Sequence, residues 1–137
     1  MLEINNTTKI AVNKKGLVSL SQAFAKYFKM TEQMVSLALV GDARMRQLNR
    51  EYRSKDQPTD ILSFANVNEI IICLPQIKRQ AKKSGHTLRF ELDFVLVHGL
   101  LHLLGYEDNT ETTRRRMIKL GEDFLSKIWY NKEVKYE

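Results

Sequence analysis

The 137-residue sequence contains one cysteine and two prolines, and it has no long run of apolar residues. A single cysteine, Cys73, excludes an internal disulfide and is typical of a reducing compartment. Because Cys73 lies in a short apolar run, we expect a buried structural thiol rather than a catalytic one. No stretch approaches the roughly 20 apolar residues that a membrane span needs, and no basic leader precedes an apolar segment. The sequence therefore predicts a cytoplasmic protein with no membrane partner.

The length and composition predict one domain over residues 1–137. Apolar residues make up 43% of the chain and charged residues 28%, which is ordinary for a globular protein. The length suffices to bury a core, and no repeat, low-complexity segment or linker divides the chain. The highly charged stretch 131–137 is expected to be a frayed tail.

Positive charge is in excess, with 22 Lys and Arg against 16 Asp and Glu and a net charge of +6. The basic residues form three clusters: Arg44, Arg46, Arg50, Arg53 and Lys55; Lys78, Arg79, Lys82 and Lys83; Arg114, Arg115, Arg116 and Lys119. Such clusters favour a polyanionic partner, because neutralised phosphates release condensed counterions. Each cluster alone could equally be a solvated helix face. Three clusters in a short chain favour nucleic acid.

The apolar spacing predicts nine elements in the order β-α-β-α-β-β-α-α-α. The strands are expected at 2–4, 35–40, 59–64 and 70–74, and the helices after Ser19 or Ser21, at about 43–52, from Pro75 to about 83, at about 88–104 and at about 111–129. In the second helix, Met45, Leu48 and Tyr52 are expected on the apolar side. Thr87 is expected to cap the fourth helix. This order predicts an α+β fold, with helices over one mixed sheet.

Two histidines lie four residues apart in a nearly continuous apolar run. On a helix, His98 and His102 project from the same face and can reach one point. Gly105 then supplies the positive φ that ends a helix and lets an acidic residue return towards the imidazoles. Two imidazoles and a third ligand, with a position left for water, are the arrangement of catalytic zinc.

The alternative is that both histidines simply belong to a buried helix. Their neighbours are almost all Leu and Val, so we expect the imidazoles to be the only polar groups there. Buried polar groups need partners, which favours the metal interpretation. In the helical motif H-E-x-x-H a glutamate general base follows the first histidine, but here that residue is Gly99. A zinc peptidase is therefore disfavoured.

Three blocks of the sequence resemble the YbeY family, bacterial rRNA maturation factors described as metal-dependent endoribonucleases. Residues 97–108 are similar to its H-G-x-L-H-L-x-G-Y-D-H motif, 48–53 to its N-x-x-Y-R block and 58–64 to its T-D-V-L-S-F block. The blocks occur in the family's order and together span about half the chain, residues 48–108. Three ordered blocks are far more specific than any one alone.

Two departures indicate a divergent member of that family. The family's third histidine falls on Asp108, and Glu107 precedes it. The family's G-D-I segment corresponds to Asn68, Glu69 and Ile70, after a short connection. A carboxylate is an acceptable zinc ligand, so the first departure preserves a ligand of another kind.

The resemblance implies a small mixed sheet with the metal-site helix packed on it, in a metalloprotease-like architecture. It also implies a single-strand-specific endoribonuclease that matures rRNA, including the 3′ end of 16S rRNA, and acts in ribosome quality control. The expected partners are rRNA and the small ribosomal subunit, with a ribosomal protein or a GTPase as a further partner and no DNA. The candidate RNA-binding residues are Arg50, Arg53, Lys55, Lys78, Lys82 and Arg114.

The resemblance also implies roles for individual residues. His98, His102 and Asp108 would bind one Zn²⁺ per chain, with Glu107 as the alternative third ligand. Other divalent metals, including Fe(II), suit two histidines and a carboxylate as well. Arg53, on the arginine of the Y-R block, would act beside His98 and His102 as a catalytic residue that binds phosphate.

Two questions stay open at the level of sequence. No general base is evident, and Glu107 and Asp60 are the nearest acids, although Asp60 is expected to order its loop through backbone hydrogen bonds. His86 lies outside the motifs and is expected to be exposed. The competing function is a non-catalytic ribosome- or RNA-binding protein with a weakened metal site.

Overall fold

The computed structural model describes residues 2–30, 33–55 and 59–131. Its elements are β1 (Leu2–Asn6), α1 (Lys14–Tyr27), β2 (Val35–Val40), α2 (Asp42–Arg53), β3 (Ile61–Phe64), the 3-10 helix η1 (Ala65–Val67), β4 (Glu69–Cys73), α3 (Leu74–Ser84), α4 (Leu88–Leu103) and α5 (Glu111–Asn131). The predicted order is confirmed, with η1 added. Apart from Asn131, which ends α5, the expected tail lies outside the described residues. Within these residues, no helix has the length and apolarity needed to cross a membrane.

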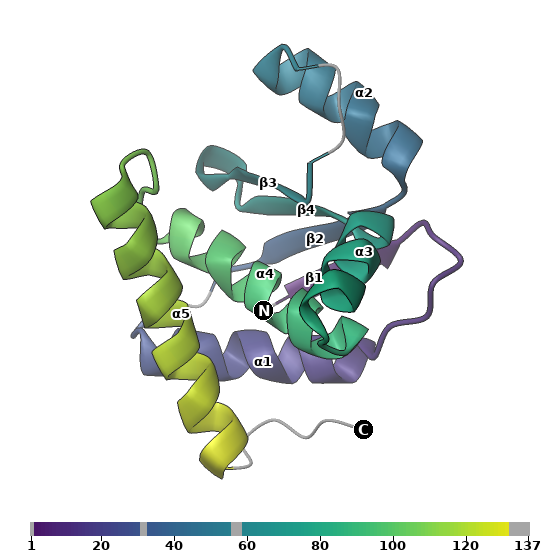
Figure 1. Cartoon of the computed structure of the whole chain (residues 1–137). Coiled ribbons are helices and arrows are strands. Elements are labelled where there is room, and N and C mark those ends of the chain that lie inside the picture. Colours follow the sequence, from purple (N-terminus) through teal and green to yellow (C-terminus); the bar gives the residue numbers. More distant parts are fainter. Residues whose placement is uncertain (1, 31–32, 56–58, 132–137) are drawn as a thin grey trace.

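The four strands form one mixed sheet in the order β1-β2-β4-β3. The pairs β1–β2 and β2–β4 are parallel, whereas β3 runs antiparallel to β4 at the edge. Helix α2 lies on one side of the sheet, and α1 and α4 lie on the other, with α5 packed on α4 (Figure 1). The predicted α+β class with a helix-covered mixed sheet is therefore confirmed.

Alternation along the strands divides the apolar side chains between two cores. Ile70 and Ile72 of β4 join the larger core under α1, α4 and α5, while Ile71 and Cys73 join a smaller core under α2. Successive strand residues point to opposite faces, and a sheet covered on both sides therefore reads as a continuous apolar run. The buried Cys73 was predicted and is confirmed.

Helix α1 begins earlier than predicted. Asn13, rather than Ser19 or Ser21, caps it, and the Asn13 side-chain oxygen accepts a hydrogen bond from the Gly16 N–H at 3.0 Å. The extra turn buries Leu17, which is fully inaccessible and continues the apolar stripe. The predicted cap of α4 is confirmed, because Thr87 Oγ1 accepts from the backbone N–H of Phe90 at 3.0 Å.

Tyr52 was expected on the same side of α2 as Met45 and Leu48, and its contact with Phe64, which packs against the core of those two residues, agrees with this expectation. Met45 and Leu48 are buried, but Tyr52 is 62% exposed. At the last turn of α2, the aromatic neighbour of Tyr52 is Phe64 of the edge strand, with the ring centroids 5.2 Å apart. Phe64 meets the tyrosine ring edge to face, and much of the Tyr52 side chain remains exposed to solvent.

The departure at Asn68 preserves a backbone conformation that glycine adopts freely. Asn68 has φ 51° and ψ 51°, in the left-handed region, where it ends η1 just before β4 begins. Asparagine tolerates this region better than most residues with a side chain. Its Nδ2 also donates to Gln33 Oε1 at 2.6 Å. The exchange of the family's glycine for asparagine is thus compatible with the tight β3–β4 connection.

Gly99 lets α4 approach the sheet closely. A Cβ atom at this position would lie 2.7 Å from Ile61 Cδ1 and 3.2 Å from Ile70 Cδ1. These distances are shorter than a van der Waals contact, so the Ile61 and Ile70 side chains would have to shift to admit a Cβ atom here. The residue that replaces the glutamate of H-E-x-x-H is therefore a buried packing residue, and a glutamate there would point into the core.

We expect alanine substitutions at Gly99 of α4 and at Gly121 of α5 to change the free energy of unfolding in opposite directions. Alanine favours a helix by about 1 kcal/mol over glycine, but overpacking costs about 1–3 kcal/mol. Gly99→Ala should therefore lower the free energy of unfolding by about 1 kcal/mol. Gly121→Ala should raise it by about 0.5–1 kcal/mol, since its Cβ would lie at an ordinary 3.4 Å from Val97 Cγ1. Urea denaturation measures both, and a Gly99→Ala variant as stable as the wild type would contradict the close approach.

Candidate metal centre

The candidate centre forms where α4 ends and the chain reverses. Gly105, with φ 101°, takes a backbone conformation that other residues rarely adopt. The Gly105 N–H donates to the His102 carbonyl oxygen at 3.0 Å, and the Tyr106 N–H donates to the Leu101 carbonyl oxygen at 3.1 Å. These bonds satisfy the last carbonyls of the helix and direct the following residues back along it. The reversal brings Asp108 to the two histidines of α4.

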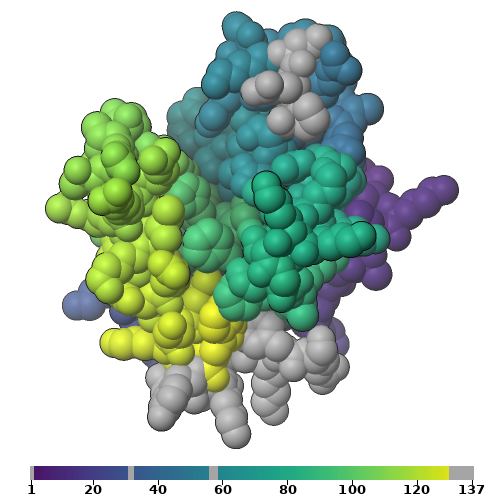
Figure 2. All heavy atoms as spheres, in the orientation of Figure 1, coloured from purple at the N-terminus to yellow at the C-terminus, as the bar shows by residue number. Residues whose placement is uncertain are grey.

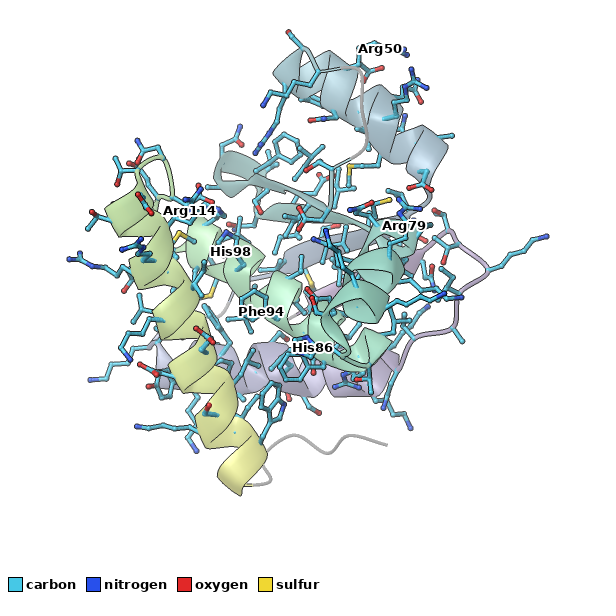
Figure 3. All side chains as sticks on the ribbon, viewed as in Figure 1. Arg50, Arg79, His86, Phe94, His98 and Arg114 are labelled. Atoms are coloured by element: carbon cyan, nitrogen blue, oxygen red, sulfur yellow. The ribbon has the colours of Figure 1, made fainter. Side chains whose placement is uncertain are left out.

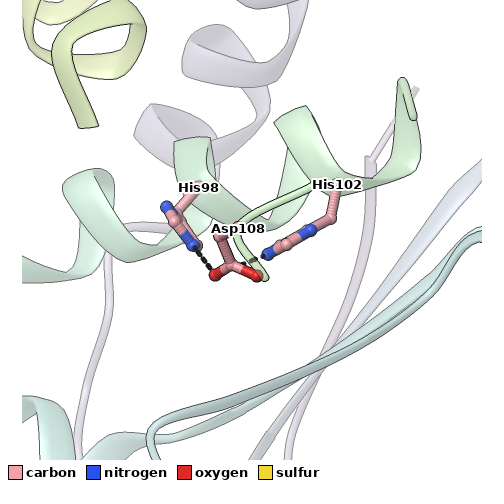
Figure 4. Close-up of side chains that lie close together, drawn as sticks. All are labelled: His98, His102 and Asp108. Carbon is pink, nitrogen blue, oxygen red and sulfur yellow. Dashed lines mark hydrogen bonds and ion pairs between the residues drawn. The ribbon is translucent and has the colours of Figure 1, made fainter. Parts of the chain in front are cut away.

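Three side chains converge on one point. Asp108 Oδ2 lies 3.2 Å from His98 Nε2 and 3.3 Å from His102 Nε2 (Figure 4). The two imidazole rings are nearly perpendicular, at 83°, with their centroids 4.9 Å apart. Zinc–nitrogen and zinc–oxygen bonds of about 2.0–2.2 Å in a tetrahedron place neighbouring ligand atoms about 3.3 Å apart. The two distances to Asp108 match this spacing.

The hydrogen bonds of His102 also fit a cation. His102 Nδ1 lies 3.0 Å from the Tyr106 carbonyl oxygen, which can only accept, so Nδ1 carries the proton. In the neutral imidazole, Nε2 then presents a lone pair to the Asp108 carboxylate, and two acceptors face each other. A proton on Nε2 or a cation between the two groups resolves this conflict. In metal-bound histidines, the ring nitrogen that does not bind the metal commonly donates to a carbonyl oxygen, and this bond fixes the orientation of the ring.

The two imidazoles affect the charge of Asp108. Burial raises the pKa of this carboxyl group, but the hydrogen bond with His98 and the electrostatic interactions with both imidazoles outweigh burial. The pKa of Asp108 is therefore lowered from its usual value. The carboxylate is ionised at neutral pH, as a metal ligand must be.

A pocket of about 480 Å³ surrounds the cluster. Its walls come from the end of α2, the segment that leads into β3, α4 and the return loop, and they include Arg53, Asp60, Ser63, Glu107 and Tyr106. The pocket thus holds all three predicted catalytic residues, Arg53, His98 and His102, although Arg53 is far from the two histidines in the sequence. In the space-filling view, α2 and the start of α5 form separate projections of the surface (Figure 2).

The other acids of the site behave differently from Asp108. Glu107 is exposed on the pocket wall, and the three-residue cluster of possible ligands among the described residues contains Asp108 rather than Glu107. Asp60 was expected to order its loop through backbone hydrogen bonds, and part of that loop, residues 56–58, lies outside the described residues. The carboxylate also accepts a hydrogen bond from Gln80 Nε2 of α3 at 3.4 Å. Its carbonyl oxygen accepts from the Cys73 N–H at 2.9 Å.

Most of the predicted RNA-binding residues lie outside this pocket. Arg50, Arg79 and Arg114 come from α2, α3 and the start of α5 (Figure 3). The pocket lining among the described residues includes Arg53 but not Arg50, Lys55, Lys78, Lys82 or Arg114. The sequence clusters therefore spread over three helices, and of the predicted RNA-binding residues Arg53 is the one at the histidines.

Arg79, one of the clustered basic residues, is paired with a carboxylate of this chain. Arg79 Nη2 lies 2.7 Å from Asp42 Oδ1, which the Cys73 thiol approaches at 3.3 Å. The hydrogen bond from Arg79 holds the pKa of Asp42 below its usual value, and burial raises the pKa of Cys73 to about 11. These contacts join α2, β4 and α3. The thiol is therefore protonated at neutral pH, in agreement with a structural role.

Two further predictions, one about His86 and one about the polar groups of α4, can be compared with the structure. His86 is exposed, as expected, and its ring packs on Phe90 with Nδ1 3.2 Å from Glu91 Oε1.

The expectation that the imidazoles are the only polar groups of a buried α4 is wrong. Asp93 is fully buried and is paired with Arg89 at 2.9 Å. The i, i+4 spacing of Arg89 and Asp93 could have indicated this pair.

The fold and the cluster define a class of small α+β proteins that carry two histidines and a carboxylate at the end of a sheet-packed helix. Comparison with known families is specific: the sequence model of the endoribonuclease YbeY family matches residues 3–129. The chain therefore belongs to this family, and the resemblance found in the sequence is confirmed.

Individual relatives agree with this assignment. Endoribonuclease YbeY of Halalkalibacterium halodurans is 34% identical over 90% of this chain and 91% of its own length. The protein of the same name from Acholeplasma laidlawii is 41% identical over 70% of this chain and 75% of its own. The solution structure of TM1509 from Thermotoga maritima superposes with a TM-score of 0.65 at 27% identity, covering 100% of this chain and 97% of that one.

We expect Gly105→Ala to destabilise the reversal that brings Asp108 to the histidines. A residue with a Cβ at φ 101° is strained, which costs about 1–3 kcal/mol. Thermal unfolding followed by circular dichroism measures the loss. Gly121→Ala is the matched control, because Gly121 lies inside α5 without a positive φ, and we expect no loss of stability there. Equal stability of Gly105→Ala and the wild type would contradict the strained turn.

Proposed function

We propose that this chain is a metal-dependent endoribonuclease that cleaves single-stranded RNA in the cytoplasm during rRNA maturation. The observation that carries the proposal is the convergence of His98, His102 and Asp108 in one pocket with Arg53. The names of the relatives, endoribonuclease YbeY, support the reaction class. By the same relationship we extend the proposal to the 3′ end of 16S rRNA and to ribosome quality control.

His98, His102 and Asp108 would hold one divalent ion per chain, with zinc as the first candidate. When bound, such an ion lowers the pKa of a coordinated water towards neutrality and polarises a phosphoryl oxygen. His98 and His102 present Nε2 to that position. The Tyr106 carbonyl group keeps the His102 ring in the required orientation and tautomer.

Arg53 would bind the scissile phosphate. Its planar guanidinium group can donate two parallel hydrogen bonds to phosphate oxygens and can offset the negative charge that develops on them. Proton transfer falls to one of the remaining acids of the pocket, Asp60 or Glu107. Asp60, which accepts a hydrogen bond from Gln80, is more constrained than the exposed Glu107.

We also propose rRNA in the small ribosomal subunit as the partner, with a ribosomal protein or a GTPase directing the chain to its site. The net charge of +6 favours a polyanion. The pocket is small and offers few side chains that could read base edges, so site selection requires help from the assembled particle. The candidate contacts outside the pocket are Arg50, Lys55, Lys78, Lys82 and Arg114.

Metal stoichiometry tests the ligand set. We expect elemental analysis of the untagged wild-type protein to find about one zinc per chain, because three protein ligands and an open position make up one zinc site. His98→Ala and Asp108→Ala should each lose the metal. Glu107→Ala, the matched control, should retain it. Metal retained in Asp108→Ala but lost in Glu107→Ala would exchange their roles, and a wild type that binds none would leave a non-catalytic RNA-binding protein.

Cleavage of a fluorescent single-stranded RNA tests the role of Arg53. We expect Arg53→Ala to lower kcat/KM by about 100-fold, in the range seen when a donor to a developing charge is removed. Zinc content should not change, because Arg53 is outside the ligand cluster. Lys26→Ala is the control, because Lys26 is exposed on α1 and belongs to none of the candidate RNA contacts, and it should stay within about twofold. An Arg53→Ala variant that cleaves like the wild type would remove Arg53 from the mechanism.

A further inference from the structure

Tyr52 is the most exposed aromatic side chain among the large exposed apolar residues that the structure describes, at 62%. The apolar stripe of α2 ends with it, yet the ring is not buried. Phe64 contacts it edge to face, with a centroid distance of 5.2 Å and an interplanar angle of 65°. This contact supports the ring at one edge and leaves most of its surface available.

Neighbours of the ring along the chain line the metal pocket. Arg53, the next residue of α2, lines it, and so do Ser63 and Ala65, on either side of Phe64 in the sequence. The Phe64 side chain itself packs on the α2 side of the sheet. Consecutive residues of an α-helix point about 100° apart. Since Arg53 lines the pocket, Tyr52 points in a different direction, where it contacts Phe64 of the edge strand β3.

The surroundings of Tyr52 are strongly basic. Residues 43–55 contain five basic side chains and one acidic side chain, Glu51. Arg50, one turn before Arg53, extends from the surface of α2 (Figure 3). An exposed aromatic ring inside a basic segment is the arrangement by which proteins bind single-stranded nucleic acid, with bases stacked on rings and phosphates near cations.

We propose that Tyr52, supported by Phe64, is a stacking platform for one unpaired base of single-stranded RNA, with the phosphate next to that base at Arg53. This inference rests on the proposed function and adds a substrate contact to the same site. A base inside a duplex has no free face to offer, so the platform selects single strands at the entrance to the pocket. It places the strand without reading the identity of the base, because every base has a π face.

Equilibrium binding to the metal-free protein tests the platform without any cleavage. The probes are a fluorescein-labelled RNA of eight nucleotides and an oligomer of the same length and charge in which every base is absent. We expect Tyr52→Leu to raise the Kd of the RNA about tenfold, as is typical for one lost base–aromatic stack. Tyr52→Phe should stay within about twofold. On the abasic oligomer, wild type and Tyr52→Leu should bind alike.

Tyr27→Leu is the matched control, since Tyr27 is 40% exposed on α1, on the opposite side of the sheet from α2. It should leave both Kd values unchanged. An unchanged Kd for Tyr52→Leu on the RNA, or an equal loss on the abasic oligomer, would overturn the platform. If the metal-loaded wild type still cleaves RNA in that case, the proposed function stands alone. A wild type that binds no RNA would overturn both.

Discussion

The close contact between α4 and the edge of the sheet is the constraint on which the candidate site depends. Gly99 is packed against Ile61 of β3 and Ile70 of β4, at distances that leave no space for a Cβ atom. The same approach places His98 and His102 beside the segment that leads into β3, so the pocket has α4 on one side and this segment on the other. A Cβ atom there would require the Ile61 and Ile70 side chains to shift. The glycine between the histidines thus permits this packing at the position where H-E-x-x-H has its glutamate.

The electrostatics of the site follow from the short return loop. Asp108 supplies a carboxylate where the family motif has a third histidine, which lowers the net charge of the ligand set. The imidazoles hold the pKa of Asp108 below its usual value, and the Tyr106 carbonyl group fixes the tautomer of His102. Two acceptors that face each other across about 3.3 Å form a poor contact by themselves and a good one around a cation. The departure from the family motif thus changes the ligand type but is compatible with metal binding.

Local patterns in the sequence predicted much of this structure. Helical spacing, strand alternation and the Thr87 cap are short-range properties, so the order of the elements and the mixed, covered sheet followed from them. The pairing of His98 with His102 is likewise local, because the helical period determines it. Two features were missed for different reasons. The Arg89–Asp93 pair is local to α4, and its i, i+4 spacing was a signal that could have been used. The exposure of Tyr52 depends on how far the sheet extends under the end of α2, which no local pattern reports.

The amino-acid sequence alone was therefore enough to predict the set of elements, the family and the helical histidine pair. Tertiary structure alone decided that Asp108 rather than Glu107 meets the imidazoles, that Arg53 from α2 enters the same pocket, and that Arg79 is paired with Asp42. The physical reason is distance along the chain. Periodicity reports which side of a helix or strand is buried, but packing of one element against another selects the side chains that share a site.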